Sequence, residues 1–479
     1  MDRILASLVL LLALVAACNQ DPDPYVPRPT ADLGLPPVPP ESTRCSPTPA
    51  TQKLRSELLF EHPWTSNVSI QDAAVAPDGN IVLAVIVAPG SVLFGQTYGD
   101  VQKLVIKLSR DGKQVLWRSP PLVPIHTGRA WVRTNGPDIL FADFNIEPNR
   151  VGERVRLARL SDRDGTVLRT VVIPTGTDMD LADIAVAGLP GISSDILLFV
   201  GEYEENSINS YYTTLIRFSP TLDELSRSPR PARRTPGAYH ASLSLGVDGE
   251  PVYGALSFTA TPFGQVVPDG QAEVAQVKAD GTPRWATRLR YGPKLQTSTP
   301  LDPLVSRNTT GGTALGTFTM VGATLGIGAR SFQLDGWLWV AMLQGADVRW
   351  VRSACSGTPL LLDLHATPEG GVFVAGTIGP EGSVELGGGV RLPEVGYQAG
   401  NIFVALYGPT GDIVAAATIP GMNGWFWQIL MGNAPLRRWP RTRVVPDGKD
   451  WLVFFNYSVS DPATLAVSTR AFRISISPN

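Results

Sequence analysis

Histidine side chains could bind a metal ion, but the spacing of the histidines in this chain argues against such a site. The four histidines are spread over distant segments, and no two stand at the short spacing of metal ligands. We therefore interpret them as packing or surface residues, although a fold that joins distant segments could bring them together. They are His62, His126, His240 and His365.

Two groups of aspartates supply the oxygen atoms that Ca²⁺ prefers. Asp162 and Asp164 form one group, and Asp178, Asp180 and Asp183 form the other. Neither group has the distal glutamate of a complete calcium-binding loop. We interpret both as turn residues and expect no metal site.

The residue patterns that activate a nucleophile are missing from the sequence. It has no Ser/His/Asp set in a suitable context, no phosphate-binding loop and no Gly-x-Ser-x-Gly elbow. The acidic cluster of Glu202, Glu204 and Glu205 favours a solvated loop. A pair of distant carboxylates for glycoside chemistry stays open, because folding could bring them together. We predict that the chain is not an enzyme and uses no cofactor.

A segment rich in tryptophan and arginine is the candidate for binding a partner. These two residue types are enriched at the energetic hot spots of interfaces. As an exposed loop the segment would bind a protein or stack on a sugar. The alternative is an outer strand over 425–431 followed by a packed connection. The candidate residues are Trp425, Phe426, Trp427, Arg437, Arg438 and Trp439.

The elements that must position these groups are strands, because a tight turn followed by an apolar, β-branched run occurs seven times. The turn glycines are about 55 to 62 residues apart, with a longer gap of about 78 before the last copy. A second turn, often Asp-Gly, follows in most copies and marks a hairpin. This period in an all-β pattern predicts a seven-bladed β-propeller with one four-stranded blade per repeat. The first-turn glycines are Gly79, Gly136, Gly191, Gly249, Gly311, Gly370 and Gly448.

The seventh copy is one strand short. We predict that residues 54–65 supply the missing strand and close the ring, which would cover edges that otherwise invite aggregation. The propeller is expected over 54–479. Its blades are expected to begin near residues 68, 128, 181, 240, 302, 360 and 440.

The repeats resemble the seven-bladed propeller repeats that are common in extracytoplasmic proteins of high-GC bacteria. The resemblance is clearest in copy six, over 368–377, 385–389 and 401–406, and copy five echoes it over 311–318 and 336–341. Many proteins of this group have no assigned activity. The resemblance therefore implies a fold and a compartment rather than a reaction.

Residues 111–117, from Asp111 to Trp117, look like the end of the tryptophan-docking motif of quinoprotein propellers. In that family the glycine turn and the tryptophan lock neighbouring blades. The adjacent cysteine pair that is typical of its quinone-using members is missing here. We interpret the tryptophans as packing between blades, where an aromatic side chain buries a large apolar area.

The N-terminus has the layout of a secretion signal over 1–17, with a short charged start and an apolar stretch too short to span a bilayer. The segment Val15-Ala16-Ala17-Cys18 resembles the lipobox of bacterial lipoproteins. That resemblance implies cleavage before Cys18 and lipid attachment to its thiol, which would hold the protein at a membrane. Asn19 in place of aspartate favours the outer membrane.

A proline-rich stretch follows over 18–53 and predicts an extended tether. The remaining cysteines, Cys45 and Cys355, are an even pair in an oxidising compartment and could form a disulfide. Two unpaired thiols remain the alternative, because sequence alone does not place the two Cα atoms within bonding range.

Composition sets the remaining limits. The chain of 479 residues is 43% hydrophobic and 17% charged, with a net charge of −3, so it can bury a large core and has no basic surface for nucleic acid. We expect a monomeric, lipid-anchored propeller at the bacterial cell envelope that acts as a non-enzymatic binding or scaffolding module for an unknown protein or polysaccharide. Rival hypotheses are a lectin-like carbohydrate-binding role, an envelope-assembly factor, and a hydrolase or lyase in the central funnel.

Overall fold

The computed structural model describes nineteen stretches of the chain, all within one compact unit that spans 40–479. Every regular element in these stretches is a strand, and none of the described residues forms a helix that could cross a membrane. The stretches are 41–42, 49–63, 68–122, 130–145, 154–173, 179–186, 192–203, 211–227, 241–246, 248–257, 271–278, 283–291, 303–318, 324–357, 359–378, 383–392, 400–424, 442–461 and 466–478.

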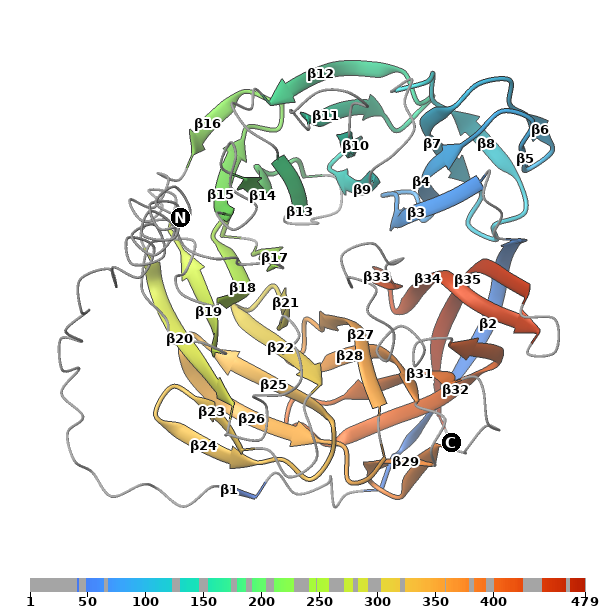
Figure 1. The fold of residues 1–479 in the computed structure, drawn as a ribbon. Helices are drawn as coiled ribbons and strands as arrows, with labels where there is room; N and C mark the ends of the chain where they lie inside the picture. The colour runs from blue at the N-terminus through green and yellow to red at the C-terminus, as the bar shows by residue number, and fades with distance from the viewer. Residues whose placement is uncertain are drawn as a thin grey trace, which may run out of the picture. The chain divides into compact units, whose positions relative to one another are not determined.

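Blades 1 to 3 are plain antiparallel sheets of four strands (Figure 1). Blade 1 also carries a short hairpin of β5 (Val92–Leu93) and β6 (Gln96–Thr97). Its sheet contains β3 (Val68–Val75), β4 (Ile81–Val87), β7 (Gln102–Leu108) and β8 (Val115–Arg118). Blade 2 contains β9 (Ala130–Asn135), β10 (Asp138–Asn145), β11 (Arg154–Ser161) and β12 (Val167–Ile173). Blade 3 contains β13 (Met179–Ala185), β14 (Ile196–Tyr203), β15 (Tyr211–Phe218) and β16 (Glu224–Arg227).

Blades 4 and 5 share a hairpin. It lies between the second and third strands of blade 5 in sequence, but it pairs with the outer strand of blade 4. Blade 4 contains β17 (Ala241–Leu245), β18 (Pro251–Ser257), β19 (Gln271–Val277) and β20 (Pro283–Tyr291). Blade 5 contains β21 (Leu304–Arg307), β22 (Gly312–Phe318), β25 (Leu338–Gln344) and β26 (Asp347–Ser353). The hairpin is β23 (Thr324–Ile327) and β24 (Arg330–Gln333), and the N-terminal β1 (Glu41–Ser42) adds to it in parallel.

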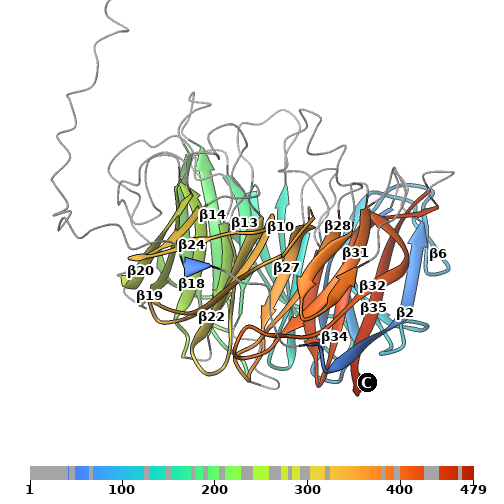
Figure 2. The same cartoon turned by 90° about the horizontal axis from the view of Figure 1, so that it is seen from below.

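Blade 7 takes its fourth strand from the N-terminal side of the chain, as the sequence predicted. Blade 6 contains β27 (Pro359–Ala366), β28 (Val372–Ile378), β31 (Gly400–Tyr407) and β32 (Ile413–Gly424), with a hairpin of β29 (Val384–Gly387) and β30 (Val390–Leu392). Blade 7 contains β33 (Thr442–Asp447), β34 (Asp450–Asp461), β35 (Ala466–Pro478) and β2 (Gln52–Pro63). β2 lies antiparallel to β35 from Gln52 opposite Pro478 to Pro63 opposite Ser468, and both views show the two strands side by side (Figures 1 and 2). The chain therefore forms a closed seven-bladed β-propeller.

The first turns of the repeats explain why glycine recurs there. Six of the seven turn glycines are described, and all six have positive φ, from 62° at Gly136 to 90° at Gly370. L-residues with a side chain rarely adopt this conformation, whereas glycine does so at little cost. The seventh, Gly191, lies outside the described residues.

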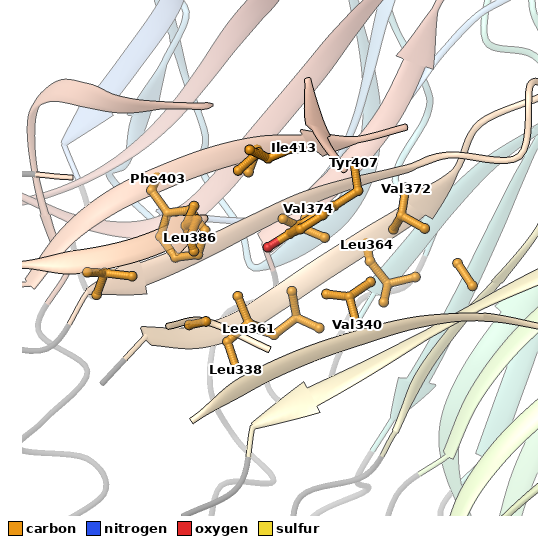
Figure 3. Close-up of a cluster of buried hydrophobic side chains, with 14 of the residues drawn as sticks. Leu338, Val340, Leu361, Leu364, Val372, Val374, Leu386, Phe403, Tyr407 and Ile413 are labelled. Carbon is orange, nitrogen blue, oxygen red and sulfur yellow. The ribbon is translucent and has the colours of Figure 1, made fainter. Parts of the chain in front are cut away.

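Apolar side chains fill the space between neighbouring blades. Figure 3 shows this at the junction of blades 5 and 6, where Val340 of β25 faces Leu364 of β27 and Val374 of β28. The alternation along each strand sends residues to both faces, and both faces of a blade are covered by its neighbours. Burying one such side chain is worth roughly 1.5–3 kcal/mol, so these layers supply much of the stability.

A second set of contacts joins each outer strand to the next blade. Trp117 of β8 lies against Gly165 in the second turn of blade 2, and its indole N–H donates to the Asp162 carbonyl at 2.8 Å. Trp350 of β26 lies against Gly411 of blade 6 in the same way. These contacts confirm that both tryptophans pack between blades.

Candidate functional site

Several residues that the sequence singled out lie outside the described part of the chain. They include Cys18, Cys45 and the whole tryptophan- and arginine-rich segment with Trp425, Phe426, Trp427, Arg437, Arg438 and Trp439. Cys355 is described, lies two residues after β26 and is disulfide-bonded. Both other cysteines lie outside the described stretches, so the pairing of Cys355 with Cys45 stays a prediction.

The first strands of the blades surround the centre of the ring and carry five charged residues there (Figure 1). We call these residues the axial cluster. Three carboxylates and two guanidinium groups come together from five different blades. The members are Asp72 of β3, Arg133 of β9, Asp183 of β13, Asp363 of β27 and Arg443 of β33.

Both arginines bridge the same two carboxylates. Arg133 lies 2.6 Å from Asp72 and 3.5 Å from Asp183, and Arg443 lies 3.0 Å from Asp72 and 3.4 Å from Asp183. Asp72 is completely buried and Asp183 nearly so, while the arginines keep about a sixth of their side-chain surface exposed, at 16% and 17%. The four side chains therefore form a closed, charge-balanced group.

A β-bulge in the first strand sets the direction of each of the three aspartate side chains. The register of the first strand shifts between Ile70 and Asp72, between Leu181 and Asp183, and between Leu361 and Asp363. A bulge inserts one residue and re-aims a side chain. At Asp72 and Asp183 the carboxylate also accepts the N–H of the following residue, at 3.0 and 2.9 Å. The three aspartates thus occupy equivalent positions in blades 1, 3 and 6.

The axial cluster belongs to a larger set of hydrogen bonds that we call the inner belt. At each junction, a side chain on the first strand of one blade bonds to the first strand of the next. The donors and acceptors around the ring are Val132 N to Asp72, Arg133 to Ile184 O, Leu243 N to Asp183, Val305 N to Ser242, Ala366 N to Ser306, Val444 N to Asp363, and Arg443 to Asp72. All seven junctions are therefore bonded, including the one that closes the ring between blades 7 and 1.

The charges in the cluster shift one another's pKa values. Burial raises the pKa of Asp363 to about 6, although Arg443 and the N–H groups of Val444 and Leu364 oppose the shift. Burial would lower the pKa of Arg443, but the surrounding carboxylates outweigh it and raise that pKa above its ordinary value. Burial and the nearby Arg443 lower the pKa of Arg133. Three carboxylates thus share two cations, and Asp363 takes up a proton at a higher pH than an ordinary aspartate does.

The contacts of the cluster suit holding the blades together better than reacting with a substrate. Asp72 and Asp183 each bind two guanidinium groups and backbone N–H groups, so these carboxylates are already occupied. Within the stretches that the structure describes, no group of three His, Cys, Asp or Glu residues is arranged to hold a metal. His365 lies in the same strand as Asp363 but packs against Trp451, and burial lowers its pKa to about 4.

Sequence reasoning did not find the inner belt, although the chain carries a signal for it. A polar residue stands seven positions before the first-turn glycine at Asp72, Ser242 and Asp363, and five positions before it at Ser306 and Arg443. Both positions share one face of the strand because its period is two. A polar residue that recurs at one face of the otherwise apolar first strands is thus the sequence pattern that indicates the inner belt.

The fold and the cluster define this chain as a closed β-propeller with paired charges at its centre. No protein-family model and no curated protein matches the sequence. Among solved structures, a mutant of prolyl oligopeptidase B from Galerina marginata bound to a macrocyclization substrate is similar, with a TM-score of 0.45 and 10% identity. The match covers 86% of this chain and 51% of that one, so the chain spans about half the length of that protein.

A member of the DUF4221 family from Bacteroides vulgatus is similar with a TM-score of 0.35 and 10% identity, over 74% of this chain and 94% of the other. Both TM-scores are below 0.5, and neither likeness says anything about activity. The seven-bladed arrangement rests on the strand pairing of this chain.

Proposed function

We propose that this chain is a lipid-anchored propeller of the bacterial cell envelope that acts as a non-enzymatic binding or scaffolding module. The observation that supports it most is the inner belt, in which charged groups at the ring centre bind neighbouring blades. A ring bonded at every junction is a rigid support for loops that bind a partner. The partner is a protein or a polysaccharide, and the segment with Trp425 and Trp427 is the proposed contact.

Retention by envelope material tests the binding role. The full chain is immobilised and exposed to solubilised envelope proteins and to a glycan array. Replacement of Trp425 and Trp427 by alanine is expected to abolish retention of the bound component. Replacement of the exposed Leu116 and Leu225 on the rim serves as the control and is expected to leave it unchanged. Equal retention by both double variants would contradict the assignment of the contact to this segment.

The proposed lipid anchor rests on the segment that ends in Cys18. A Cys18→Ser variant is expected to move from the membrane fraction to the soluble fraction, because the thiol that would carry the lipid is gone. Cys45→Ser makes the same chemical change outside that segment and is expected to stay with the membrane. Retention of the Cys18 variant in the membrane fraction would refute lipidation at this residue.

The end of the stalk is bound to the propeller, which supports a disulfide between Cys45 and Cys355. Ser42 pairs with Gln333 of β24, and the N–H of Asp335, two residues on, donates to Ser353 next to the Cys355 segment. Farther along, the N–H groups of Ala50 and Thr51 donate to carbonyls of blade 6. Peptide mapping without reduction is expected to recover a peptide pair that contains Cys45 and Cys355. Recovery of Cys355 linked to Cys18 would refute both this pairing and lipidation.

A further inference from the structure

Phe94 has a backbone conformation that normally requires glycine. Its φ is 46°, and among the described residues Leu222 is the only other non-glycine residue with a positive φ. Phe94 and Gly95 form the two-residue turn between β5 and β6 of blade 1. A bulky side chain rarely adopts this conformation, and it does so only where surrounding contacts hold it there. We therefore looked for the contact that holds Phe94.

Two other hairpins show which residue this turn ordinarily takes. Like β5 and β6, each of them lies between the second and third strands of its blade in sequence. The hairpin β23–β24 turns at residues 328–329, and the hairpin β29–β30 turns at residues 388–389. Their first turn residues are Gly328 and Gly388, with φ of 59° and 61°. Blade 1 thus has a phenylalanine where the equivalent hairpins have a glycine.

All three hairpins contact the outer strand of the preceding blade or the residues that follow it. In the shared hairpin, β23 pairs with β20 of blade 4. In blade 6, the carbonyl of Glu385 on β29 accepts the N–H of Cys355, two residues after β26 of blade 5, at 2.7 Å. In blade 1 the contact is aromatic, because the ring of Phe94 lies edge-on to the rings of Phe60 and His62, with centroids 6.0 and 6.1 Å away. Both partners of Phe94 belong to β2, the strand that completes blade 7.

The closing strand β2 has a shape that lets blade 1 hold it. Its register against β35 shifts between Leu58 and Phe60, so Leu59 is the extra residue of a β-bulge. Leu59 and Phe60 are both buried, in one apolar cluster with side chains of blade 1. The second turn of blade 1 lies against the same place, since a Cβ at Gly112 would stand 2.7 Å from the carbonyl oxygen of Leu59. Blade 1 therefore contacts β2 at two places, with this turn and with the hairpin.

We propose that Phe94 is a latch, whose ring keeps the closing strand β2 in place from the side of blade 1. The hairpin that carries the ring is fixed to its own blade: Arg118 of β8 donates to the carbonyl of Phe94 at 2.9 Å, and Leu93 is completely buried beside it. Release of β2 from blade 7 also breaks the contact with the latch. Blade 1 thereby controls the opening of blade 7, and the strained turn is retained because a glycine there would remove the latch.

Hydrogen exchange of the full chain under native conditions measures how often β2 is released. Phe94→Ala removes the ring and keeps the unfavourable φ. The amides of β2 are expected to exchange about tenfold faster in this variant, while those of β14 in blade 3 keep the wild-type rate. Phe94→Gly removes the ring and the strain together. Its exchange in β2 is therefore expected to lie between those of the wild type and Phe94→Ala.

Two control variants separate the latch from the rest of the hairpin. Phe94→Tyr keeps the ring and is expected to exchange like the wild type. Val92→Ala removes an apolar side chain of the same hairpin that is 56% exposed, and is expected to leave exchange in β2 unchanged. Trypsin cleavage after Arg55, an exposed residue of β2, gives an independent measure of strand release and should rank the variants in the same order. Phe94 is only partly buried, so its variants should keep the fold.

Three results would overturn the proposal. One is exchange in β2 that is no faster in Phe94→Ala than in Val92→Ala. Another is an equal acceleration in β2 and β14, which would show that Phe94 supports the whole fold rather than one strand. The third is slower exchange in β2 of Phe94→Gly than of the wild type, which would show that the strain of this turn outweighs the contact of its ring.

Discussion

Asp363 is the group of the axial cluster whose replacement should change the pH dependence of stability most clearly. It accepts the N–H of Val444 at 2.7 Å, and so joins blade 6 to blade 7. Burial raises its pKa from 3.8 to about 6, against the pull of Arg443. In an Asp363→Asn variant, the side-chain amide resembles the protonated acid in shape and does not titrate.

The sign and size of the effect follow from the pKa shift. The folded protein binds the Asp363 proton more tightly than the unfolded chain does, so the resulting stabilisation is complete below pH 3.8. It is lost as the pH rises through about 6. The shift corresponds to at most about 3 kcal/mol, and water that reaches the partly buried carboxyl reduces this value. The Asp363→Asn variant does not lose stability in this way as the pH rises. The free energy of unfolding of the variant minus that of the wild type should therefore increase by up to about 3 kcal/mol from pH 4 to pH 7.

Denaturant unfolding of the two proteins at several pH values between 4 and 8 measures this difference. A constant offset between them is expected as well, because an amide offers one acceptor oxygen instead of two. Asp347→Asn, at an exposed position of β26, removes the same charge outside the axial cluster and is the matched control. Parallel profiles for Asp363→Asn would show that this carboxyl does not titrate near pH 6 in the folded protein.

Three further substitutions test the contacts between blades. Arg443→Met should lower the free energy of unfolding by about 3–5 kcal/mol, because it leaves Asp72 and Asp183 with one cation. A loss below about 1 kcal/mol in denaturant unfolding would contradict the pairing of Arg443 with these two carboxylates. Gly165→Ala places a Cβ 2.6 Å from the ring of Trp117, whereas Gly345→Ala, also at positive φ, meets nothing within 4 Å. The first should cost about 1–3 kcal/mol more than the second, and equal shifts in thermal unfolding would argue against docking of the tryptophan. Leu222→Gly relieves a positive φ of 66°, which should stabilise the fold by about 1–2 kcal/mol. It also removes a side chain that is 1% exposed, which should destabilise the fold by about 2–5 kcal/mol. A net loss of stability is therefore expected, and a gain would refute this balance.

The sequence determined the architecture because its signals are local. A first-turn glycine such as Gly370 has positive φ in a tight turn, and the apolar run after it forms the second strand of its blade. The short last copy also indicated correctly that a strand from the N-terminal side completes blade 7. Both inferences need only the spacing of the repeats and the number of strand patterns in each repeat.

The ring centre and the shared hairpin depend on contacts between distant residues. Asp72 and Arg443 are 371 residues apart, and the recurring polar position on the first strands does not tell which of these residues pair with each other. The pairing of β23 with β20 likewise joins two blades, and the local sequence of the hairpin, one short apolar run and one mostly polar run, does not indicate it. Predicting them requires the positions of whole blades relative to one another.

The completion of blade 7 by β2 has a kinetic consequence. The hydrogen bond between Glu61 and Arg470 spans 409 residues, so β2, which is synthesised early, finds its partner only when almost the whole chain has been made. Long-range pairing slows folding, and a ring that is still open exposes strand edges while it waits. Once β2 is in place, the N-terminal side of the chain can leave blade 7 only after this long strand separates from β35. The pairing that delays folding should therefore also slow unfolding, and the lifetime of the native state would then be set by this junction.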